Sequence, residues 1–284
     1  MNESQALHQA RSRPKAILFD LDGTLYRGDE PVPGADKLIA GLVARGIACW
    51  YITNNSTRTP AQVAEHLHRM NIPAVPEQVI TSAEGAAAYA KQHYGRADAF
   101  VLGEHGLQEA MSEAGFRLAE EGPAQVVVQG LDRTLTYDRM TRAVHHLLSG
   151  AVYLLTNPDL RLPVADGVLP GAGSIAAALQ AASGVQPTVI GKPSSILMNF
   201  ALERAGVAPE DAWVVGDNPN TDIAAGLAVG CQTVLVLTGL CTEADWRSRC
   251  EAAGAMPDKV CRDPQELSSW IEQIDSQLEH ESKG

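Results

Sequence analysis

The sequence lacks any apolar run long enough to cross a membrane, and the polar segment Met1–Pro14 has no apolar region of the kind found in signal peptides. It also lacks an excess of basic residues, because 22 Lys and Arg stand against 34 Asp and Glu, a net charge of −12. Nucleic-acid backbones are bound by surfaces rich in Lys and Arg. We therefore expect neither a membrane nor a nucleic acid as a main partner. An anionic substrate would have to be met by a metal ion and local hydrogen-bond donors.

Cysteine is scarce and shows no ligand or disulfide pattern. The five cysteines are odd in number, widely spaced and never arranged as C-x-x-C: Cys49, Cys231, Cys241, Cys250 and Cys261. This pattern is typical of free thiols in a reducing cytoplasm, and it speaks against a disulfide framework or a zinc site. The histidine pairs His66/His68 and His145/His146 lack the i, i+4 spacing of a helical metal pair, so we expect these side chains at the surface.

The 284 residues, 45% of them hydrophobic and 20% charged, alternate between helix-like and strand-like segments. Helices are predicted over Ala35–Arg45, Pro60–Asn71, Ser82–Tyr94, Leu107–Ala114, Tyr137–Leu148, Ser174–Ser183, Ser194–Ala205 and Ile223–Val229, and a last one in Asp263–Gly284 before a frayed end. Strands are predicted over Ala16–Phe19, Ala48–Ile52, Ala99–Leu102, Val126–Val128, Val152–Leu155, Ala212–Val215 and Thr233–Leu237. Such alternation predicts an α/β fold with a doubly wound parallel sheet.

The apolar run Ala16–Phe19 is followed at once by the string D-x-D-G-T-L, residues 20–25. The run predicts a buried parallel strand, whose carboxyl end is where open α/β sheets bind ligands. The two-residue period of a strand places Asp20 and Asp22 on one side, about 7 Å apart. Two carboxylates so close repel unless a cation neutralises them or one carries a proton. The alternative is an ordinary acidic turn, in which Gly23 lets the chain leave the strand without a clash.

Two further strand ends carry groups suited to a phosphoryl ligand. The segment Thr53-Asn54-Asn55-Ser56 follows a predicted strand and offers hydroxyl, amide and backbone N–H donors. Its alternative is an Asx or Ser/Thr turn that leads into the next helix. Lys192 stands between Gly191 and Pro193 after the strand-like Thr188–Ile190, so its ammonium would sit in a fixed turn and could bind phosphate. Its alternative is a surface lysine.

A third strand end supplies two more acids. Asp217 ends the strand-like Trp213–Val215, and Asp222 follows five residues later near the start of a helix. An acid in that position is commonly a cap or a partner of the helix dipole. Together with Asp20 and Asp22 at the same sheet edge, however, these acids indicate a site for a hard cation. Mg²⁺ prefers such oxygen ligands.

The order of the four motifs, D-x-D-G-T-L, T-N-N-S, G-K-P and G-D-x-x-x-x-D, resembles that of the haloacid dehalogenase (HAD) superfamily from Asp20 to Asp222. The gap between the second and third motifs resembles the NagD-like branch, whose α/β cap is inserted there. Segments 130–137, 156–159 and 169–174 look like the cap signatures of that branch. The resemblance implies a Rossmann-like core over 1–83 and 186–284, and an α/β cap over 84–185 that selects the substrate. Gln129, Leu240 and Cys241 look unusual but lie outside the motifs.

The resemblance also implies residue roles. Asp20 would attack phosphorus to form an aspartyl-phosphate, and Asp22 would act as general acid and base. Mg²⁺ would be held by the Asp20 carboxylate, the Asp22 backbone carbonyl and Asp217, with Asp222 in or just behind its ligand shell. The phosphoryl group would be held by Thr53 and Lys192, which also take part in catalysis, and by Gly23, Asn54, Asn55 and Asn218.

A phosphomonoester phosphatase is the favoured function because Asp22 supplies the acid and base that hydrolysis needs. A dehalogenase would leave Asp22 and the metal acids without a clear use. A phosphomutase on the same scaffold and a non-catalytic phosphometabolite-binding protein stay as alternatives. The partner would be a small phosphorylated metabolite such as a sugar phosphate, a nucleoside monophosphate or an aryl phosphate. Asn157, Asp159 and Arg161 follow a predicted cap strand and would contact it, and a homo-oligomer is plausible.

Overall fold

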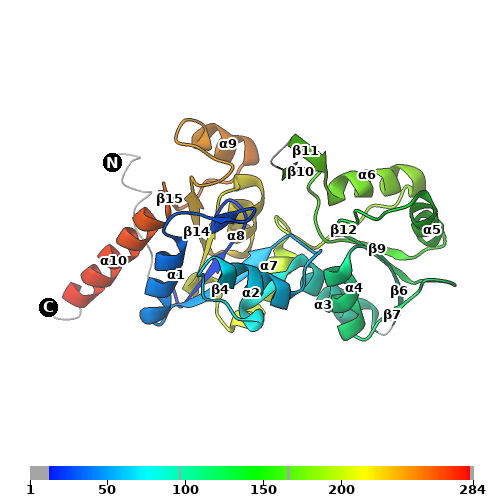
Figure 1. Ribbon diagram of the computed structural model, residues 1–284, viewed down its shortest axis with the longest axis horizontal. Helices are drawn as coiled ribbons and strands as arrows, with labels where there is room; N and C mark the ends of the chain where they lie inside the picture. The colour runs from blue at the N-terminus through cyan, green and yellow to red at the C-terminus, as the bar shows by residue number, and fades with distance from the viewer. Residues whose placement is uncertain (1–12, 96, 165–166, 282–284) are drawn as a thin grey trace. The chain divides into compact units, whose positions relative to one another are not determined.

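The computed structural model describes residues 13–95, 97–164 and 167–281, which form two compact units. The first unit comprises the described residues of 1–52, 64–79 and 201–284, and the second comprises those of 53–63 and 80–200. Each unit contains a parallel β-sheet with helices packed on it (Figure 1). The predicted α/β fold is therefore confirmed. Among the described residues no helix has the length and apolar character needed to cross a bilayer.

The sheet of the first unit has the strand order β15-β14-β13-β1-β4-β5. Its strands are β1 Ala16–Phe19, β4 Ala48–Thr53, β5 Val79–Thr81, β13 Ala212–Gly216, β14 Gln232–Val236 and β15 Lys259–Cys261. Strand β1 pairs in parallel with both β13 and β4, and its four residues are fully buried. A strand covered on both sides is continuously apolar, which is why the run Ala16–Phe19 could be recognised in the sequence.

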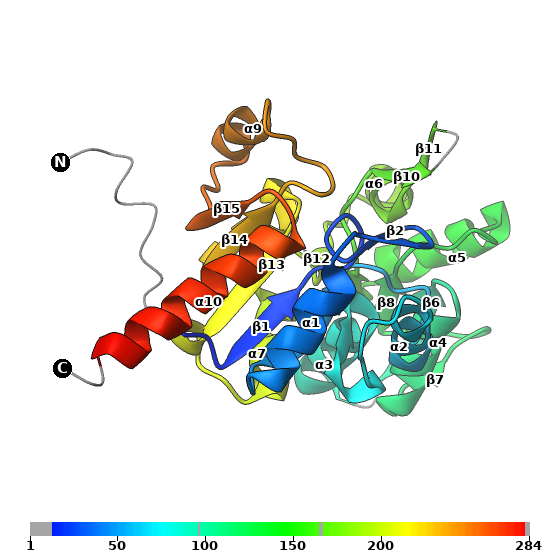
Figure 2. The same cartoon turned by 60° about the vertical axis from the view of Figure 1, so that its left-hand side comes forward.

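The helices of this unit cover the sheet and follow its strands. They are α1 Ala35–Ala44, α8 Ala224–Val229, α9 Trp246–Ala253 and α10 Pro264–Glu281, together with parts of α2 Pro60–Arg69 and α7 Ser195–Ala205. Helix α10 lies beside α1 (Figure 2) and stacks Trp270 on Trp213 of β13, with ring centroids 4.7 Å apart. The predicted final helix is thus α10, and the frayed end predicted after it lies outside the described residues.

The second unit is built on a five-stranded sheet of order β12-β9-β8-β6-β7, in which every pairing is parallel. Its strands are β6 Asp98–Leu102, β7 Arg117–Leu118, β8 Val126–Gln129, β9 Val152–Leu155 and β12 Thr188–Val189. Its helices are α3 Ser82–Tyr94, α4 His105–Glu113, α5 Tyr137–Leu148 and α6 Ala172–Ser183. Alternate strand residues face opposite sides, so Val126 and Val128 pack with α3 and α4 while Val127 packs with α5 and α6.

All eight helices predicted inside the chain are present, with ends within two residues of the prediction, and so are the seven predicted strands. The missed elements are short or polar: the hairpin β2 Tyr26–Arg27 and β3 Glu30–Pro31, the hairpin β10 Arg161–Val164 and β11 Gly167–Pro170, and β5, β7, β15 and α9. Two to four residues are too few to display a strand period, and these pairings depend on neighbours that are distant in sequence.

The division into units differs from the expected core and cap boundaries. The second unit contains all of the expected cap, 84–185, and in addition 53–63, 80–83 and 186–200. Strand β12, which those boundaries place in the core, pairs instead with β9 of the second sheet. Lys192 therefore follows a strand of the second sheet. A substrate-selecting role for 84–185 stays a prediction.

One expectation about side-chain exposure is wrong. His66 is buried, with an exposed fraction of 3%, and its Nε2 lies 3.0 Å from the carbonyl oxygen of Gly28. The ring also packs edge-on against Tyr26, at a centroid distance of 4.9 Å. The hairpin β2–β3, which the sequence does not reveal, covers this histidine and removes it from water.

The five cysteines are free and buried, as expected of a framework without disulfides. Burial raises the pKa of the Cys49, Cys231 and Cys261 thiols to about 12, and that of Cys241 to about 11. At about pH 8 these thiols carry little of the reactive thiolate form.

We therefore predict that a disulfide reagent modifies none of the five cysteines within minutes in the folded protein and all five after unfolding in guanidinium, measured by thiol titration. A rapidly reacting thiol in the folded protein would contradict this.

Candidate active site

Three carboxylates meet at the carboxyl edge of the first sheet. Asp20 follows β1 directly, and its N–H continues the pairing with β13 by donating to the Val215 carbonyl oxygen at 2.8 Å. Asp217 follows β13, and Asp222 lies in the helical turn Pro219–Ile223 after it. One carboxylate oxygen from each of the three aspartates lies within 4.8 Å of the others. The predicted convergence of these acids is therefore observed, and it arises because β1 and β13 are neighbours in a parallel sheet.

Glycines allow the two buried acids to approach the backbone. A Cβ on Gly23 would lie 2.4 Å from the Asp217 Oδ2, and one on Gly239 would lie 1.9 Å from the same atom. Asp222 is enclosed in the same way, because a Cβ on Gly216 would lie 2.3 Å from the Cβ of Asp222. Such separations leave no room for a side chain at these three positions. The two carboxylates are therefore held in place by close packing.

Backbone donors hold the same carboxylates. The Leu240 N–H donates to Asp217 Oδ2 at 2.5 Å, and the Asn218 N–H donates to Asp222 Oδ2 at 3.1 Å. The Thr24 hydroxyl lies 3.4 Å from Asp20 Oδ2. These contacts stabilise negative charge at fixed positions.

The segment Thr238–Leu240 after β14 belongs to the site, although the sequence analysis placed Leu240 outside the motifs. Besides the Leu240 contact with Asp217, the Thr238 hydroxyl donates to the Gly23 carbonyl oxygen at 2.7 Å. Arg27 of β2 donates from Nε to the Thr238 carbonyl oxygen at 2.7 Å. The signal that could have identified this segment is its place at the carboxyl end of a fourth buried strand, with a glycine.

Asp22 has a different environment from the three convergent acids. Strand β1 ends at Phe19 and the chain turns through Gly23, which has a φ of +85°, so the predicted two-residue strand period does not reach Asp22. Asp22 is exposed to solvent, yet desolvation by the surrounding protein atoms raises the pKa of its carboxyl group. Hydrogen bonds from the N–H groups of Gly28 and Gly23, and the nearby His66, act in the opposite direction. A raised pKa favours the protonated form, which a general acid requires.

The second and third motifs meet within the second unit. The Asn54 amide Nδ2 donates to the Lys192 carbonyl oxygen at 2.9 Å, and the Lys192 N–H donates back to Asn54 Oδ1 at 2.8 Å. Lys192 is buried, with 3% of its surface exposed. The structure thus joins Thr53–Ser56 to Lys192, as their expected common role requires, but the Asn54 side chain holds the lysine backbone. Its direct contact with a phosphoryl group stays a prediction.

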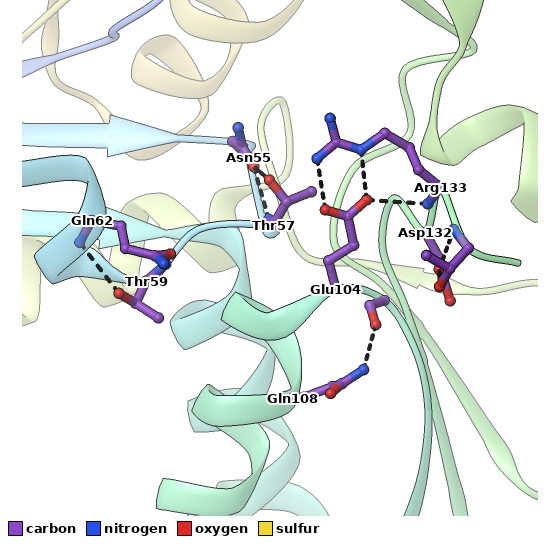
Figure 3. A network of polar contacts seen from close by, with 10 residues as sticks. Asn55, Thr57, Thr59, Gln62, Glu104, Gln108, Asp132 and Arg133 are labelled. Atoms are coloured by element: carbon purple, nitrogen blue, oxygen red, sulfur yellow. Dashed lines mark hydrogen bonds and ion pairs between the residues drawn. The ribbon is translucent and has the colours of Figure 1, made fainter. Parts of the chain in front are cut away.

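Several other predicted site residues form local turns. Thr53 Oγ1 accepts from the Asn55 N–H at 3.0 Å, and Asn55 Oδ1 accepts from the Thr57 N–H and hydroxyl at 2.8 Å each (Figure 3). Asn218 Oδ1 likewise accepts from the Asn220 N–H at 3.0 Å. These are the Asx-type turns that formed the alternative interpretation. They fix the backbone and do not exclude ligand contacts by the remaining donors.

The predicted cap residues lie after β9 in the second unit. Asn157 Oδ1 accepts from the Asp159 N–H at 2.8 Å, so Asn157 also forms an Asx turn. Asp159 is exposed and Arg161 begins β10. The Gly173 N–H donates to the Asp159 carbonyl oxygen at 2.9 Å, which joins this loop to the start of α6. A contact of Asn157, Asp159 or Arg161 with a substrate stays a prediction.

The donor set of the first unit fits a hard divalent cation. Three carboxylate oxygens within 4.8 Å of one another supply negative charge from a half-buried and two buried aspartates. Oxygen ligands of this kind suit Mg²⁺, which retains water molecules in its remaining positions. These three acids lie in the first unit, whereas Thr53, Asn54 and Lys192 lie in the second.

Comparison with protein families agrees with the four motifs. A family model described as haloacid dehalogenase-like hydrolase matches residues 17–117, and a model described as HAD-hydrolase-like matches residues 189–267. The first match contains Asp20, Asp22 and the Thr53–Ser56 segment. The second contains Lys192, Asp217 and Asp222.

Individual relatives are similar over most of their length. The chain is 40% identical to an acid sugar phosphatase of Staphylococcus epidermidis over 235 residues, which are 83% of this chain and 91% of the relative. Among solved structures, a p-nitrophenyl phosphatase from Archaeoglobus fulgidus is 32% identical with a TM-score of 0.86, covering 90% of this chain and 98% of its own. A 4-nitrophenylphosphatase from Thermotoga maritima is 33% identical with a TM-score of 0.86, covering 92% and 99%.

The packing of Gly239 against Asp217 generates a prediction. In Gly239→Ala the new Cβ would overlap Asp217 Oδ2, so the carboxylate must shift. Disturbing a group that orients a metal ligand typically weakens metal binding about 10–100-fold, and we expect that loss for Mg²⁺ measured by calorimetry. The control is Gly41→Ala in α1, where nothing lies within 4 Å of the added Cβ. Unchanged Mg²⁺ affinity in a folded Gly239→Ala protein would contradict the assignment of Asp217.

Proposed function

The chain belongs to the haloacid dehalogenase-like hydrolases, and we propose that it is a Mg²⁺-dependent phosphomonoester hydrolase that works through an aspartyl-phosphate intermediate. The observation that supports this most is the convergence of Asp20, Asp217 and Asp222 at one sheet edge, with carboxylate oxygens within 4.8 Å. Phosphoryl transfer depends on positioned groups and on the stabilisation of charge. A cluster of three acids is suited to hold a cation for that purpose.

In the proposed reaction Asp20 is the nucleophile. Its carboxylate oxygen bonds to phosphorus as the ester P–O bond breaks, and Asp22 gives its proton to the departing oxygen. Asp22 then takes a proton from water, whose oxygen attacks phosphorus, so that phosphate leaves and the Asp20 carboxylate is restored. Bound Mg²⁺, held by Asp20, Asp217, Asp222 and the Asp22 carbonyl, would neutralise charge on the phosphoryl oxygens.

The second unit would supply phosphoryl-binding groups. Lys192 offers an ammonium in a turn that Asn54 fixes through two hydrogen bonds. Thr53 and Asn55 offer donors on the same segment, and the motif resemblance adds Gly23 and Asn218 of the first unit as further phosphoryl contacts. These roles rest on the motif resemblance, with the local geometry of each unit as support.

The names of the relatives favour hydrolysis over the alternatives. The similar proteins are named as phosphatases of sugar phosphates and of nitrophenyl phosphate, so we propose small phosphorylated metabolites of the sugar type as substrates and aryl phosphates as artificial ones. A phosphomutase or a non-catalytic phosphometabolite-binding protein has no such support. A cytoplasmic location and a homo-oligomeric state are further proposals.

Replacing either carboxylate of the D-x-D string by an amide should reduce activity, but by different amounts. Asp20→Asn should abolish phosphate release because an amide does not attack phosphorus. Asp22→Asn should lower kcat on the order of 10²–10⁴-fold, the usual contribution of a positioned acid and base. Asp29→Asn serves as the control, since its side chain in the neighbouring hairpin is 95% exposed. Turnover at the normal rate in purified Asp20→Asn protein would refute the covalent mechanism.

The acid cluster predicts a strict requirement for metal. Phosphate release should stop in EDTA and return when Mg²⁺ is added in excess, because three convergent carboxylates repel one another and the phosphoryl group unless a cation is present. Excess Ca²⁺ should inhibit, since its larger and looser coordination shell displaces the nucleophile. Full activity of metal-stripped protein in the presence of EDTA would show that the cluster has another purpose.

A further inference from the structure

The carboxyl edge of the second sheet brings together loops that the sequence separates. Because all its strands are parallel, the loops after β6, β8, β9 and β12 leave from the same edge. Near their starts these four loops carry, in the same order, Glu104, Arg133, Asn157 and Lys192. Ligands of open parallel sheets bind at this edge. The charged pair Glu104–Arg133 therefore lies where a ligand of this unit is expected.

The segment Thr53–Arg58, called here the 53–58 loop, runs along that edge. Near its start, the side chain of Asn54 makes two hydrogen bonds with the backbone of Lys192. The loop continues past β9, where the Thr156 hydroxyl donates to Ser56 Oγ at 3.0 Å. The loop thus connects the predicted phosphoryl-binding residues with the strand ends of this sheet.

Both loops that carry the charged pair pack against the 53–58 loop. The Gly106 N–H, two residues after Glu104, donates to the Thr57 carbonyl oxygen at 3.1 Å. A Cβ on Gly106 would lie 2.5 Å from the Arg58 carbonyl oxygen, and a Cβ on Gly130 would lie 2.3 Å from Ser56 Oγ. Glu104 and Arg133 are therefore held beside the phosphoryl-binding segment at its Thr57 end, as Figure 3 shows.

The pair is joined by three hydrogen bonds, and its arginine is the more exposed partner, since the Glu104 side chain is 19% exposed. Arg133 donates from Nε to Glu104 Oε1 and from Nη2 to Oε2 at 2.7 Å each, and its backbone N–H adds a bond of 3.1 Å. These hydrogen bonds lower the pKa of Glu104 and raise that of Arg133, so both stay charged at neutral pH. The Arg133 side chain is 62% exposed. Oε1 of Glu104 accepts two of these hydrogen bonds and Oε2 accepts one, so the remaining guanidinium N–H groups and the second lone pair of Oε2 are available to a ligand.

We propose that the Glu104–Arg133 pair contacts the leaving group and selects neutral, hydroxyl-rich phosphate esters of the sugar type. This inference rests on the proposed phosphatase function. A hydroxyl group is both donor and acceptor, and the pair offers donors from the guanidinium and one acceptor site at Glu104 Oε2. Its net charge is zero, so a leaving group with a second anionic group gains no electrostatic attraction. An aryl group without hydroxyls makes neither kind of hydrogen bond.

The experiment compares Glu104→Gln and Arg133→Gln on three substrates: a hexose monophosphate, a hexose bisphosphate and p-nitrophenyl phosphate. Both variants should lose about tenfold in kcat/KM on the hexose monophosphate, the effect of one or two net hydrogen bonds, with little change on p-nitrophenyl phosphate. Glu104→Gln leaves an unbalanced positive charge, so the ratio of bisphosphate to monophosphate kcat/KM should rise. Arg133→Gln leaves a negative charge, and the same ratio should fall.

The opposite end of β6, the strand that precedes Glu104, offers a matched control. Arg117 and Asp98 form a forked ion pair at the amino end of β6, with Arg117 Nε 2.7 Å from Asp98 Oδ1 and the Arg117 side chain 72% exposed. Arg117→Gln should leave all three kcat/KM values unchanged. Losses by one common factor in the two test variants, or no change, would overturn the inference and make the pair a structural link between loops. Failure of the wild-type protein to hydrolyse any of the three substrates would instead refute the proposed function, and the inference with it.

Discussion

The mutual repulsion of Asp20, Asp217 and Asp222 is the constraint on which the rest of the site depends. One oxygen of each carboxylate lies within 4.8 Å of the others, and two unit charges at about that separation repel by roughly 3 kcal/mol at an effective dielectric constant of about 20. Folding brings three such charges together, two of them buried. The backbone donors of Leu240 and Asn218 offset part of this repulsion, and the lack of side chains at Gly23, Gly216 and Gly239 leaves room for the two buried carboxylates. A divalent cation bound by the three carboxylates would neutralise their charge, which is the role that the proposed chemistry gives to Mg²⁺.

Parallel topology is what places these groups, and it acts twice in this chain. In the first unit, β1, β13 and β14 bring Asp20, Asp217 and the Thr238–Leu240 segment to one edge. In the second unit, the same rule collects the loops after β6, β8, β9 and β12. The 53–58 loop is hydrogen-bonded to that second edge through Lys192 and Thr156, so the lysine proposed to bind the phosphoryl group and the proposed leaving-group contacts share one support. The first unit thus presents a cluster of carboxylates, whereas the second presents Lys192 and the Glu104–Arg133 ion pair.

Sequence reasoning succeeded where a signal is local. Amphipathic helices, continuous apolar strands and the D-x-D string can each be recognised from residues that are close in sequence. The α/β fold and the convergence of the three acids were therefore predicted, and both are observed. It failed where a contact depends on strand order. The Leu240 contact with Asp217 and the burial of His66 under a hairpin require the three-dimensional arrangement of distant segments. Glu104 and Arg133 meet only because β6 and β8 are neighbours, and strand order is not written in either loop.

Asp22 shows how one fold places four carboxylates in different environments. The three convergent acids would share a cation in the proposed mechanism, whereas Asp22 lies in a turn beside the hairpin β2–β3, where desolvation raises the pKa of its carboxyl group. That shift is limited by the Gly28 N–H, and the Gly28 carbonyl oxygen contacts the buried His66. The same hairpin is fixed on its other side by Arg27 to Thr238, whose hydroxyl binds the Gly23 carbonyl oxygen. The hairpin therefore connects Asp22, the proposed proton donor, to the acid cluster proposed to bind the metal. A change in its position would alter the hydrogen bonding of Asp22 and, through Thr238–Leu240, the support of Asp217.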